Sequence, residues 1–287
     1  MVSVTLLPDF NDTETNPKNA PLTEADVEKY SCRPIIPRLL QSTADRLGKT
    51  PQELRILDYG CGRGELVAYL IRHGYDCYGV DIDPAYIENA RSYFSESQTS
   101  LPVISPIEND RSIFEDGFFD VIITAQVLEH VRSIEPVVRE IGRILATDGI
   151  CLHIFPPSLS VVEPHMFLPF VHWIPGNRFR RNLIHAMLSI GMGAPYFKEF
   201  STTDRTRIFF EFSITDTFYR AHRELIRLFA SHGFISRDIA REKLLHRGGT
   251  VSRVVAIPVI GRVAAWVYST FYQTYVLTAK NAKALAL

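Results

Sequence analysis

Three glycines at alternate positions directly follow an apolar segment that contains an acidic residue. Residues 55–59 (RILDY) predict a buried strand, and Gly60, Gly62 and Gly64 follow it before a helical pattern begins. Glycines let backbone N–H groups and a helix N-terminus approach a ligand closely, because a β-carbon would block that approach. The spacing is GxGxG, with Asp58 two places before the first glycine. The segment therefore predicts a cofactor site at the end of a strand.

A second carboxylate, Asp81, ends the next apolar run, YGVD. A carboxylate at the end of the second strand can accept hydrogen bonds from both hydroxyls of a ribose, a contact that any adenosine cofactor can use. A nicotinamide dinucleotide is the less favoured ligand, because its fingerprint is GxGxxG and the third glycine here comes one position early.

These segments resemble the class I S-adenosylmethionine (SAM)-dependent methyltransferases, whose first motif is an acidic residue followed by GxGxG. Residues 119–145, with the quartet Leu128-Glu129-His130-Val131, resemble the branch that contains the ubiquinone and menaquinone biosynthesis methyltransferases. The resemblance covers residues 55–156 in register and the last helix and strands more loosely. It implies SAM as the cofactor, whose cationic sulfonium suits a site that contains a carboxylate.

The resemblance also implies which residues hold the cofactor. Ile82 would pack on the adenine, Glu108 would bind the adenine amine, and Ala125 and Gln126 would line the methionine end. No glycine or Leu-Pro landmark fixes the register at Glu108, so Asn109 or Asp110 could take its place. The full predicted set is Asp58, Gly60, Cys61, Gly62, Gly64, Asp81, Ile82, Glu108, Asn109, Ala125 and Gln126.

Two histidines are candidates for acid–base chemistry. His165 follows Glu163 just past the expected fifth strand, on the rim where α/β sheets bind substrates, and its near-neutral pKa suits a general base. The alternative is a hydrogen-bonded packing residue in an aromatic loop. His130 could assist proton removal, but bracing of its loop through backbone hydrogen bonds is the preferred interpretation. Predicted substrate contacts are Tyr30, Glu163, His172 and Trp173.

Several classes of site are excluded by pattern. No HxH, HExxH or paired Asp-Asn set stands at metal-ligand spacing, so we expect no metal. A formal net charge of -1 provides no basic field for nucleic acid, and the fourth strand lacks the Asn/Asp-Pro-Pro-aromatic motif that holds a flipped base. The four cysteines lack CxxC spacing and are expected to be unpaired, in a reducing compartment.

Short apolar runs alternate with longer amphipathic segments, which indicates parallel strands joined by crossover helices. The resemblance completes this as a Rossmann-like α/β fold, a seven-stranded, mostly parallel sheet flanked by helices with its last strand antiparallel. Expected strands lie at residues 55–59, 76–81, 102–105, 120–124, 150–155, 234–239 and 273–279. Expected helices lie at residues 38–47, 65–73, 84–94, 134–145 and 217–231.

The domain prediction has four parts. Residues 1–30 form a mobile leader without a signal peptide, and residues 31–287 form one methyltransferase domain. Within it, residues 156–213 are an insertion that caps the substrate pocket, and residues 243–272 are an apolar hairpin segment. The preferred interpretation of the hairpin is core packing. The alternative is a surface at residues 254–272 that touches a membrane or a greasy substrate, in a protein otherwise expected to be cytoplasmic.

The predicted function is methyl transfer from SAM to a small-molecule, sugar-bearing or lipid-linked acceptor, with O-methylation as the first choice. The alternative is a SAM-binding module that does not catalyse and acts as a regulator or partner. The sequence leaves the acceptor and the oligomeric state open, because no motif in the insertion fixes a substrate.

Overall fold

The computed structural model describes residues 21–94 and 103–285. Its centre is a seven-stranded sheet in the order β3-β2-β1-β4-β5-β9-β8, in which β9 runs antiparallel to both β5 and β8 and the other neighbours are parallel. The predicted sheet is therefore confirmed. Its strands are β1 (Arg55–Tyr59), β2 (Asp76–Asp81), β3 (Ile104–Pro106), β4 (Phe119–Ala125), β5 (Leu145–Phe155), β8 (Ile235–Asp238) and β9 (Thr274–Ala279).

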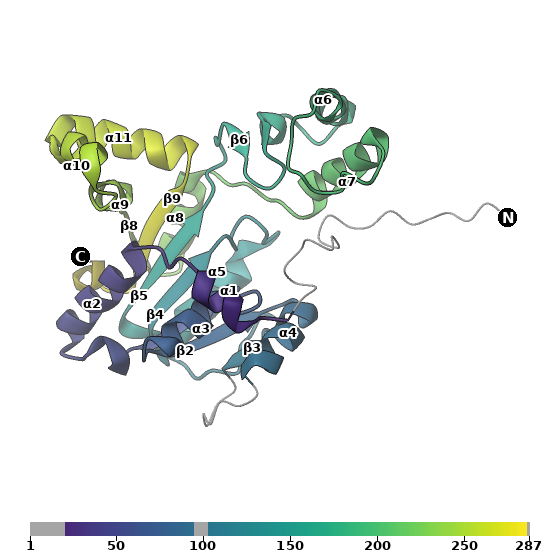
Figure 1. Ribbon diagram of the computed structural model, residues 1–287. Helices are drawn as coiled ribbons and strands as arrows, with labels where there is room; N and C mark the ends of the chain where they lie inside the picture. The colour runs from purple at the N-terminus through teal and green to yellow at the C-terminus, as the bar shows by residue number, and fades with distance from the viewer. Residues whose placement is uncertain (1–20, 95–102, 286–287) are drawn as a thin grey trace.

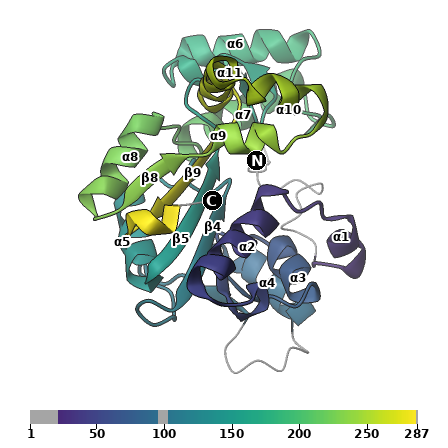
Figure 2. The same ribbon diagram turned by 90° about the vertical axis from the view of Figure 1, so that its left-hand side faces the viewer.

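Helices cover both faces of this sheet (Figures 1 and 2). One face packs on α2 (Ile35–Leu47), α3 (Glu65–Arg72) and α4 (Pro84–Phe94), and the other on α5 (Ile134–Ile144) and α8 (His222–Ser231). Successive side chains of a strand point to opposite faces, so neighbouring β1 residues serve different cores. Ile56 packs with the first set of helices and Leu57 with the second, and both are fully buried.

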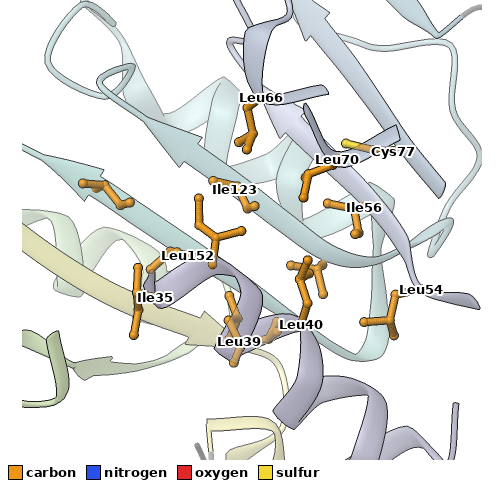
Figure 3. Packing of buried hydrophobic residues seen from close by; sticks show 14 of the residues in the cluster. Ile35, Leu39, Leu40, Leu54, Ile56, Leu66, Leu70, Cys77, Ile123 and Leu152 are labelled. Carbon is orange, nitrogen blue, oxygen red and sulfur yellow. The ribbon is translucent and has the colours of Figure 1, made fainter. Parts of the chain in front are cut away.

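The larger core lies under α2 and α3. Figure 3 shows Leu39 and Leu40 of α2 facing Ile56, Ile123 and Leu152 from three strands of the sheet. The helical spacing of the α2 leucines predicts this apolar face, and Gly48 ends the helix in the left-handed conformation with a φ of 65°. These contacts fix the strands whose carboxyl ends carry the glycine turn.

The end of the expected mobile leader is ordered. Helix α1 (Glu24–Lys29) begins at a capping box in which Thr23 and Asp26 exchange hydrogen bonds. Leu22 and Val27 are buried against Ala68 of α3. The leader prediction is therefore wrong for residues 21–30, because two apolar side chains anchor them to the sheet layer; residues 1–20 lie outside the described residues.

The insertion after β5 forms a unit with its own core. Its elements are β6 (Val162–Glu163), β7 (Leu168–Pro169), a 3-10 helix η4 (Val171–Trp173), α6 (Arg178–Ser189) and α7 (Thr202–Thr215). Buried residues from β7, α6 and α7, among them Leu168, Ile184 and Phe209, form a cluster separate from the two sheet cores. Two more 3-10 helices complete the described chain, η3 (Pro51–Glu53) and η5 (Ala282–Leu285).

The expected apolar hairpin at residues 243–272 is helical instead. It comprises the end of α9 (Ala240–Leu245), α10 (Gly249–Ala256) and α11 (Pro258–Phe271). Pro258 takes the first position of α11, where a missing N–H costs nothing, so it starts a helix and does not interrupt a strand. Within the described residues, no single helix is long and apolar enough to cross a membrane; α10 and α11 pass that test only as a pair, which is bent by 118°.

Candidate active site

The glycine turn is held tightly against the second strand. The N–H groups of Gly60 and Cys61 donate to the Val80 carbonyl at 2.7 and 3.0 Å. Gly60 has a φ of +79°, and a β-carbon there would lie 2.4 Å from Val127 Cγ2, closer than atoms can pack. Gly64 forms the N-cap of α3. The spacing of the glycines thus places a helix N-terminus beside the end of β1.

A cavity of about 350 Å³ opens beside this turn. Gly62 has a φ of +55° and no heavy atom within 4 Å of where its β-carbon would stand, so it leaves open space. The lining joins the ends of β1 and β4 to the segment before α2. The lining residues are Tyr30, Ser31, Arg33, Asp58, Gly60, Cys61, Gly62, Glu65, Leu66, Ala125 and Gln126.

Asp58 is buried in this cavity wall, with 5% of its surface exposed. Burial raises the pKa of Asp58 to about 8, and the negative charges of Asp81 and Glu65 act in the same direction. The guanidinium of Arg33 partly offsets the rise in this pKa. The site therefore favours a cationic group beside Asp58, since such a group would let the carboxylate ionise.

Asp81 lies at the end of β2, next to the turn. Its Oδ2 accepts the Gly62 N–H at 2.8 Å, and its Oδ1 accepts the Asp83 N–H at 2.9 Å. A carboxylate has about four acceptor sites, so Asp81 keeps capacity for ribose hydroxyls. Burial raises the pKa of Asp81 despite these backbone hydrogen bonds. Ile82, 74% exposed, follows it as a bare apolar surface suited to stacking on a base.

The predicted adenine-amine contact is not part of the cavity lining. Glu108 is exposed and exchanges backbone hydrogen bonds of 3.0 Å with Arg111. Asn109 and Asp110 between them have positive φ angles of 51° and 61°, a tight turn. The assignment of Glu108 or Asn109 to the adenine stays a prediction.

A carboxylate holds His165 in a fixed orientation. Glu163 is fully buried, and its Oε1 accepts from His165 Nδ1 at 2.8 Å and from the Tyr219 hydroxyl. Its Oε2 accepts the N–H groups of His165 and Met166 at 2.9 and 2.6 Å. Because Nδ1 donates to Glu163, Nε2 is the ring's acceptor, the arrangement of a carboxylate-oriented general base.

The charges of the neighbouring residues determine the protonation of His165 and Glu163. Burial by itself would lower the pKa of His165, but the hydrogen bond and charge of Glu163, with a contribution from Glu129, raise it above its usual value. The pKa of Glu163 is lowered because its bonds to His165 and Tyr219 outweigh the effect of burial. Glu163 therefore stays ionised and stabilises the imidazolium that a base must become.

The quartet after β4 brings two more titratable groups next to His165. The ring centroids of His130 and His165 lie 4.9 Å apart. His130 Nδ1 donates to the Asp216 carbonyl at 2.7 Å, and the Phe218 N–H donates to the Glu129 carbonyl at 2.6 Å. Desolvation and the neighbouring His165 lower the pKa of His130. These hydrogen bonds fasten the quartet to the segment that carries Tyr219, as the bracing interpretation of His130 expects.

Glu129 is the least satisfied group of the site. It is 3% exposed, and neither carboxylate oxygen has a hydrogen-bond partner among the described residues. Burial, with the like charge of Glu163, raises the pKa of Glu129 to about 7. One ligand atom each of Glu129, His130 and His165 lies within 4.8 Å of the others. The expected absence of a metal stays a prediction, and metal analysis of the purified protein should be directed at this cluster.

Of the remaining predicted substrate contacts, one lines the cavity and two lie in the insertion. Tyr30 lines the cavity and packs on Tyr69 at a ring-centroid distance of 5.7 Å. His172 lies in the insertion, its ring 4.9 Å from that of Tyr219. Trp173 is 45% exposed and packs on Phe170. Only Tyr30 among these three belongs to the cavity lining.

Comparison with known proteins gives the family. A family model described as a methyltransferase domain matches residues 28–189, which is more than half of the chain. The chain belongs to this family. The match confirms the predicted SAM-dependent methyltransferase domain, and its matched residues include the glycine turn, the Glu129-His130 pair and His165.

Two curated proteins of the same name are similar to the methyltransferase domain of this chain. The ubiquinone biosynthesis O-methyltransferase of Caulobacter sp. (strain K31) is 33% identical over 110 residues, 38% of this chain and 43% of that protein. The protein of the same name from Azorhizobium caulinodans is 29% identical over 153 residues, 50% of this chain and 59% of that protein. The matched part thus spans about half the length of these relatives.

Two solved structures are similar to the methyltransferase domain. A geranyl diphosphate methyltransferase in complex with GPP and sinefungin is 16% identical, with a TM-score of 0.46, over 85% of this chain and 78% of that chain. PKMT2 from Rickettsia typhi in complex with AdoHcy is 15% identical, with a TM-score of 0.49, over 85% of this chain and 53% of that chain.

SAM, the methyl donor of such domains, fits the cavity by charge. Its amino-acid end carries both a carboxylate and an ammonium group, and the lining offers Arg33 for the first and Asp58 for the second. Asp81 and Gly62 would hold the ribose side of the methyltransferase site. Arg33 could not be predicted from the sequence, because no motif marks it. Glu129 and Tyr219 were not among the predicted site residues either, although Glu129 belongs to the quartet that resembles the branch.

Proposed function

We propose that this methyltransferase domain transfers the methyl group of SAM to a hydroxyl oxygen of a small-molecule, sugar-bearing or lipid-linked acceptor. The proposal rests on the combination of two features. Asp58, at the end of β1, lines a cavity that suits a cationic ligand. Glu163 holds His165 in place, and this histidine lies beside the loop that continues β4. The name of the curated relatives, an O-methyltransferase of ubiquinone biosynthesis, supports oxygen as the methyl-accepting atom.

The bound cofactor supplies an activated methyl group for direct in-line displacement. The protein's residues provide position and a proton acceptor. His165 Nε2 would take the hydroxyl proton of the acceptor while its oxygen receives the methyl group that SAM would supply. Glu163, fully buried and ionised, stabilises the resulting imidazolium through Nδ1, and Tyr219 holds Glu163 in place. The proton then leaves His165 for solvent, which restores the base.

Exposed aromatic side chains of the insertion support an acceptor with an apolar body. Phe167 is 52% exposed, Phe170 43% and Trp173 45%. They lie within eight residues of His165 along the chain, so an apolar group could rest on them while its hydroxyl faces the base. The insertion would then act as the cap of the acceptor site.

The test separates cofactor binding from catalysis. Asp81→Ala should weaken SAM binding at least tenfold in calorimetry, because hydrogen bonds to a charged acceptor are worth about 1.5–3 kcal/mol. His165→Ala should retain SAM affinity and lose about 10²–10⁴-fold in methyl transfer to a panel of alkyl phenols and alkyl glycosides. Unchanged SAM binding in Asp81→Ala would reject the cofactor site. A wild-type protein that binds SAM but methylates no acceptor would favour the non-catalytic module.

A further inference from the structure

Helices α10 and α11 expose an unusual amount of apolar surface. Val259 of α11 is 72% exposed, Val263 56% and Trp266 63%. Their spacing of four and three residues places them on one face of the helix. The further exposed large apolar residues of this segment are Val251, Val254, Ile257, Ile260 and Tyr272. Single exposed apolar residues are common on protein surfaces, whereas a contiguous apolar surface of this kind marks a site of interaction.

The bend between the two helices is built into the packing. A β-carbon on Gly261 would lie 2.1 Å from the Val255 carbonyl oxygen, so only glycine allows α11 to pass this close to the end of α10. The pair is bent by 118°, and neither helix alone reaches the roughly 20 residues that span a bilayer. The exposed face is therefore suited to lie on a surface.

The charged residues of this segment are all basic. Residues 243–273 contain Lys243, Arg247, Arg253 and Arg262 and no aspartate or glutamate, in a chain whose formal net charge is -1. Arg247, Arg253 and Arg262 are exposed. Apolar and aromatic side chains beside arginines, without acids, form the composition of helices that lie in the interface of anionic lipids.

We propose that α10 and α11 form a docking surface for an anionic lipid bilayer. Val259, Val263 and Trp266 enter the boundary between headgroups and acyl chains, and the arginines contact lipid phosphates. The helices lie in the plane of the interface and do not cross it. This segment lies outside the residues that the family model matches, so the inference concerns this chain and not its family.

The docking surface is joined directly to the edge of the sheet that carries the cavity. Helix α11 leads into β9, whose first residue, Thr274, pairs with Phe155 at the end of β5. Gln273, just before β9, donates to the Gln126 side chain of the cavity lining at 2.9 Å. Figures 1 and 2 show α10 and α11 on the same side of the sheet as the insertion. A bilayer at α11 would therefore lie on the same side as the insertion, which the proposed function makes the cap of the acceptor site.

The experiment is co-sedimentation of the full chain with vesicles. We expect the protein to pellet with phosphatidylcholine vesicles that contain 30 mol% phosphatidylglycerol, and at least tenfold less with phosphatidylcholine alone. Raising the salt to 0.5 M should weaken the binding, because screening shortens the range of the arginine charges. Arg253→Gln and Arg262→Gln should each lower the affinity about fivefold at low salt, as expected for about 1 kcal/mol per basic residue.

Apolar variants and a matched control complete the test. The double variant Val259→Asp with Trp266→Glu should reduce vesicle binding at least tenfold. The matched control is Ile113→Asp, which places an acid at a 53% exposed apolar position on the loop before β4. This control should bind vesicles like wild type. Unchanged thermal unfolding and SAM binding show that each variant is folded. The proposal is overturned if wild type stays in the supernatant, if the double variant binds normally, or if Trp266 instead sustains a dimer in sedimentation equilibrium. SAM is not needed for vesicle binding, so the outcome is independent of methyl transfer.

Discussion

At the scale of single residues, the site combines groups that burial disfavours. Asp58 is buried beside Asp81 and Glu65, with Arg33 as its counter-charge. Glu129 is buried without a hydrogen-bond partner among the described residues. Such groups cost stability and are retained where a ligand needs them, since binding sites are where pKa values are most strongly shifted.

Asp58→Asn should change the pH dependence of stability. The pKa of Asp58 is raised to about 8 from its ordinary value of 3.8, so between these values the folded chain holds a proton that the unfolded chain releases. Stability therefore falls as pH rises from about 4 to about 8. In Asp58→Asn this loss disappears, and the decrease in Tm between pH 5 and pH 8.5 should be smaller than in wild type.

The same substitution should weaken SAM binding at pH 7, because the amide cannot compensate a cation. Glu88→Gln, on the exposed side of α4, is the matched control for the loss of one carboxylate. Parallel Tm curves for Asp58→Asn and wild type would contradict the buried-carboxylate argument.

At the scale of elements, one histidine side chain connects three neighbouring strands of the sheet. His153 of β5 is 1% exposed; its Nδ1 lies 2.9 Å from Thr124 Oγ1 of β4, and its Nε2 lies 2.8 Å from Thr278 Oγ1 of β9. Burial lowers the pKa of His153 to about 3, so the ring is neutral in the folded sheet. The last antiparallel strand is thus bound to the parallel part of the sheet by side chains as well as by the backbone ladder.

His153→Gln should make the sheet less sensitive to acid. Between pH 6.5 and about 3 the unfolded chain binds a proton at His153 that the folded chain does not, so stability present above pH 6.5 is lost as the pH falls. Glutamine cannot titrate, and urea unfolding between pH 7 and pH 4 should show a smaller loss of stability. His73→Gln, at an exposed position, is the matched control for the loss of one imidazole; a wild-type slope in His153→Gln would refute the assignment.

At the scale of the whole molecule, the sheet that carries the cavity and the insertion rest on different cores. The sheet and its helices bury two clusters, and the insertion buries a third. Both the insertion and the α9–α11 segment connect to the edge where β5 ends and β9 begins. Figure 1 shows these two groups of helices on the same side of the sheet. The separate cores allow the insertion to change while the cavity beside the glycine turn stays fixed.

Phe209→Ala should loosen the insertion without releasing SAM. Phe209 of α7 is fully buried, and truncation of a buried phenylalanine costs about 3–5 kcal/mol. Hydrogen exchange should speed up in α6 and α7 and stay slow in β1 and β4, with SAM affinity retained and methyl transfer lost. Phe119→Ala, in the sheet core, should instead speed exchange throughout. Uniform acceleration in Phe209→Ala would show that the insertion is not a separate unit.

The sequence by itself determined the sheet and the cofactor turn. Both depend on local information: strands follow from short apolar runs, and the turn needs glycine because Gly60, Gly62 and Gly64 all have positive φ angles. The positions of Asp58 and Asp81 follow from these strands, since parallel strands end at the same edge of a sheet.

Tertiary structure alone decided the rest. Glu129, Glu163 and Tyr219 meet because the insertion folds back onto the quartet after β4, and no local periodicity records a contact between segments so far apart in the chain. Leu22 and Val27 order the end of the leader only because Ala68 lies beneath them. The segment at residues 243–272 has an apolar pattern that fits a strand or a helix, and packing against Gly261 selected the bent helix pair.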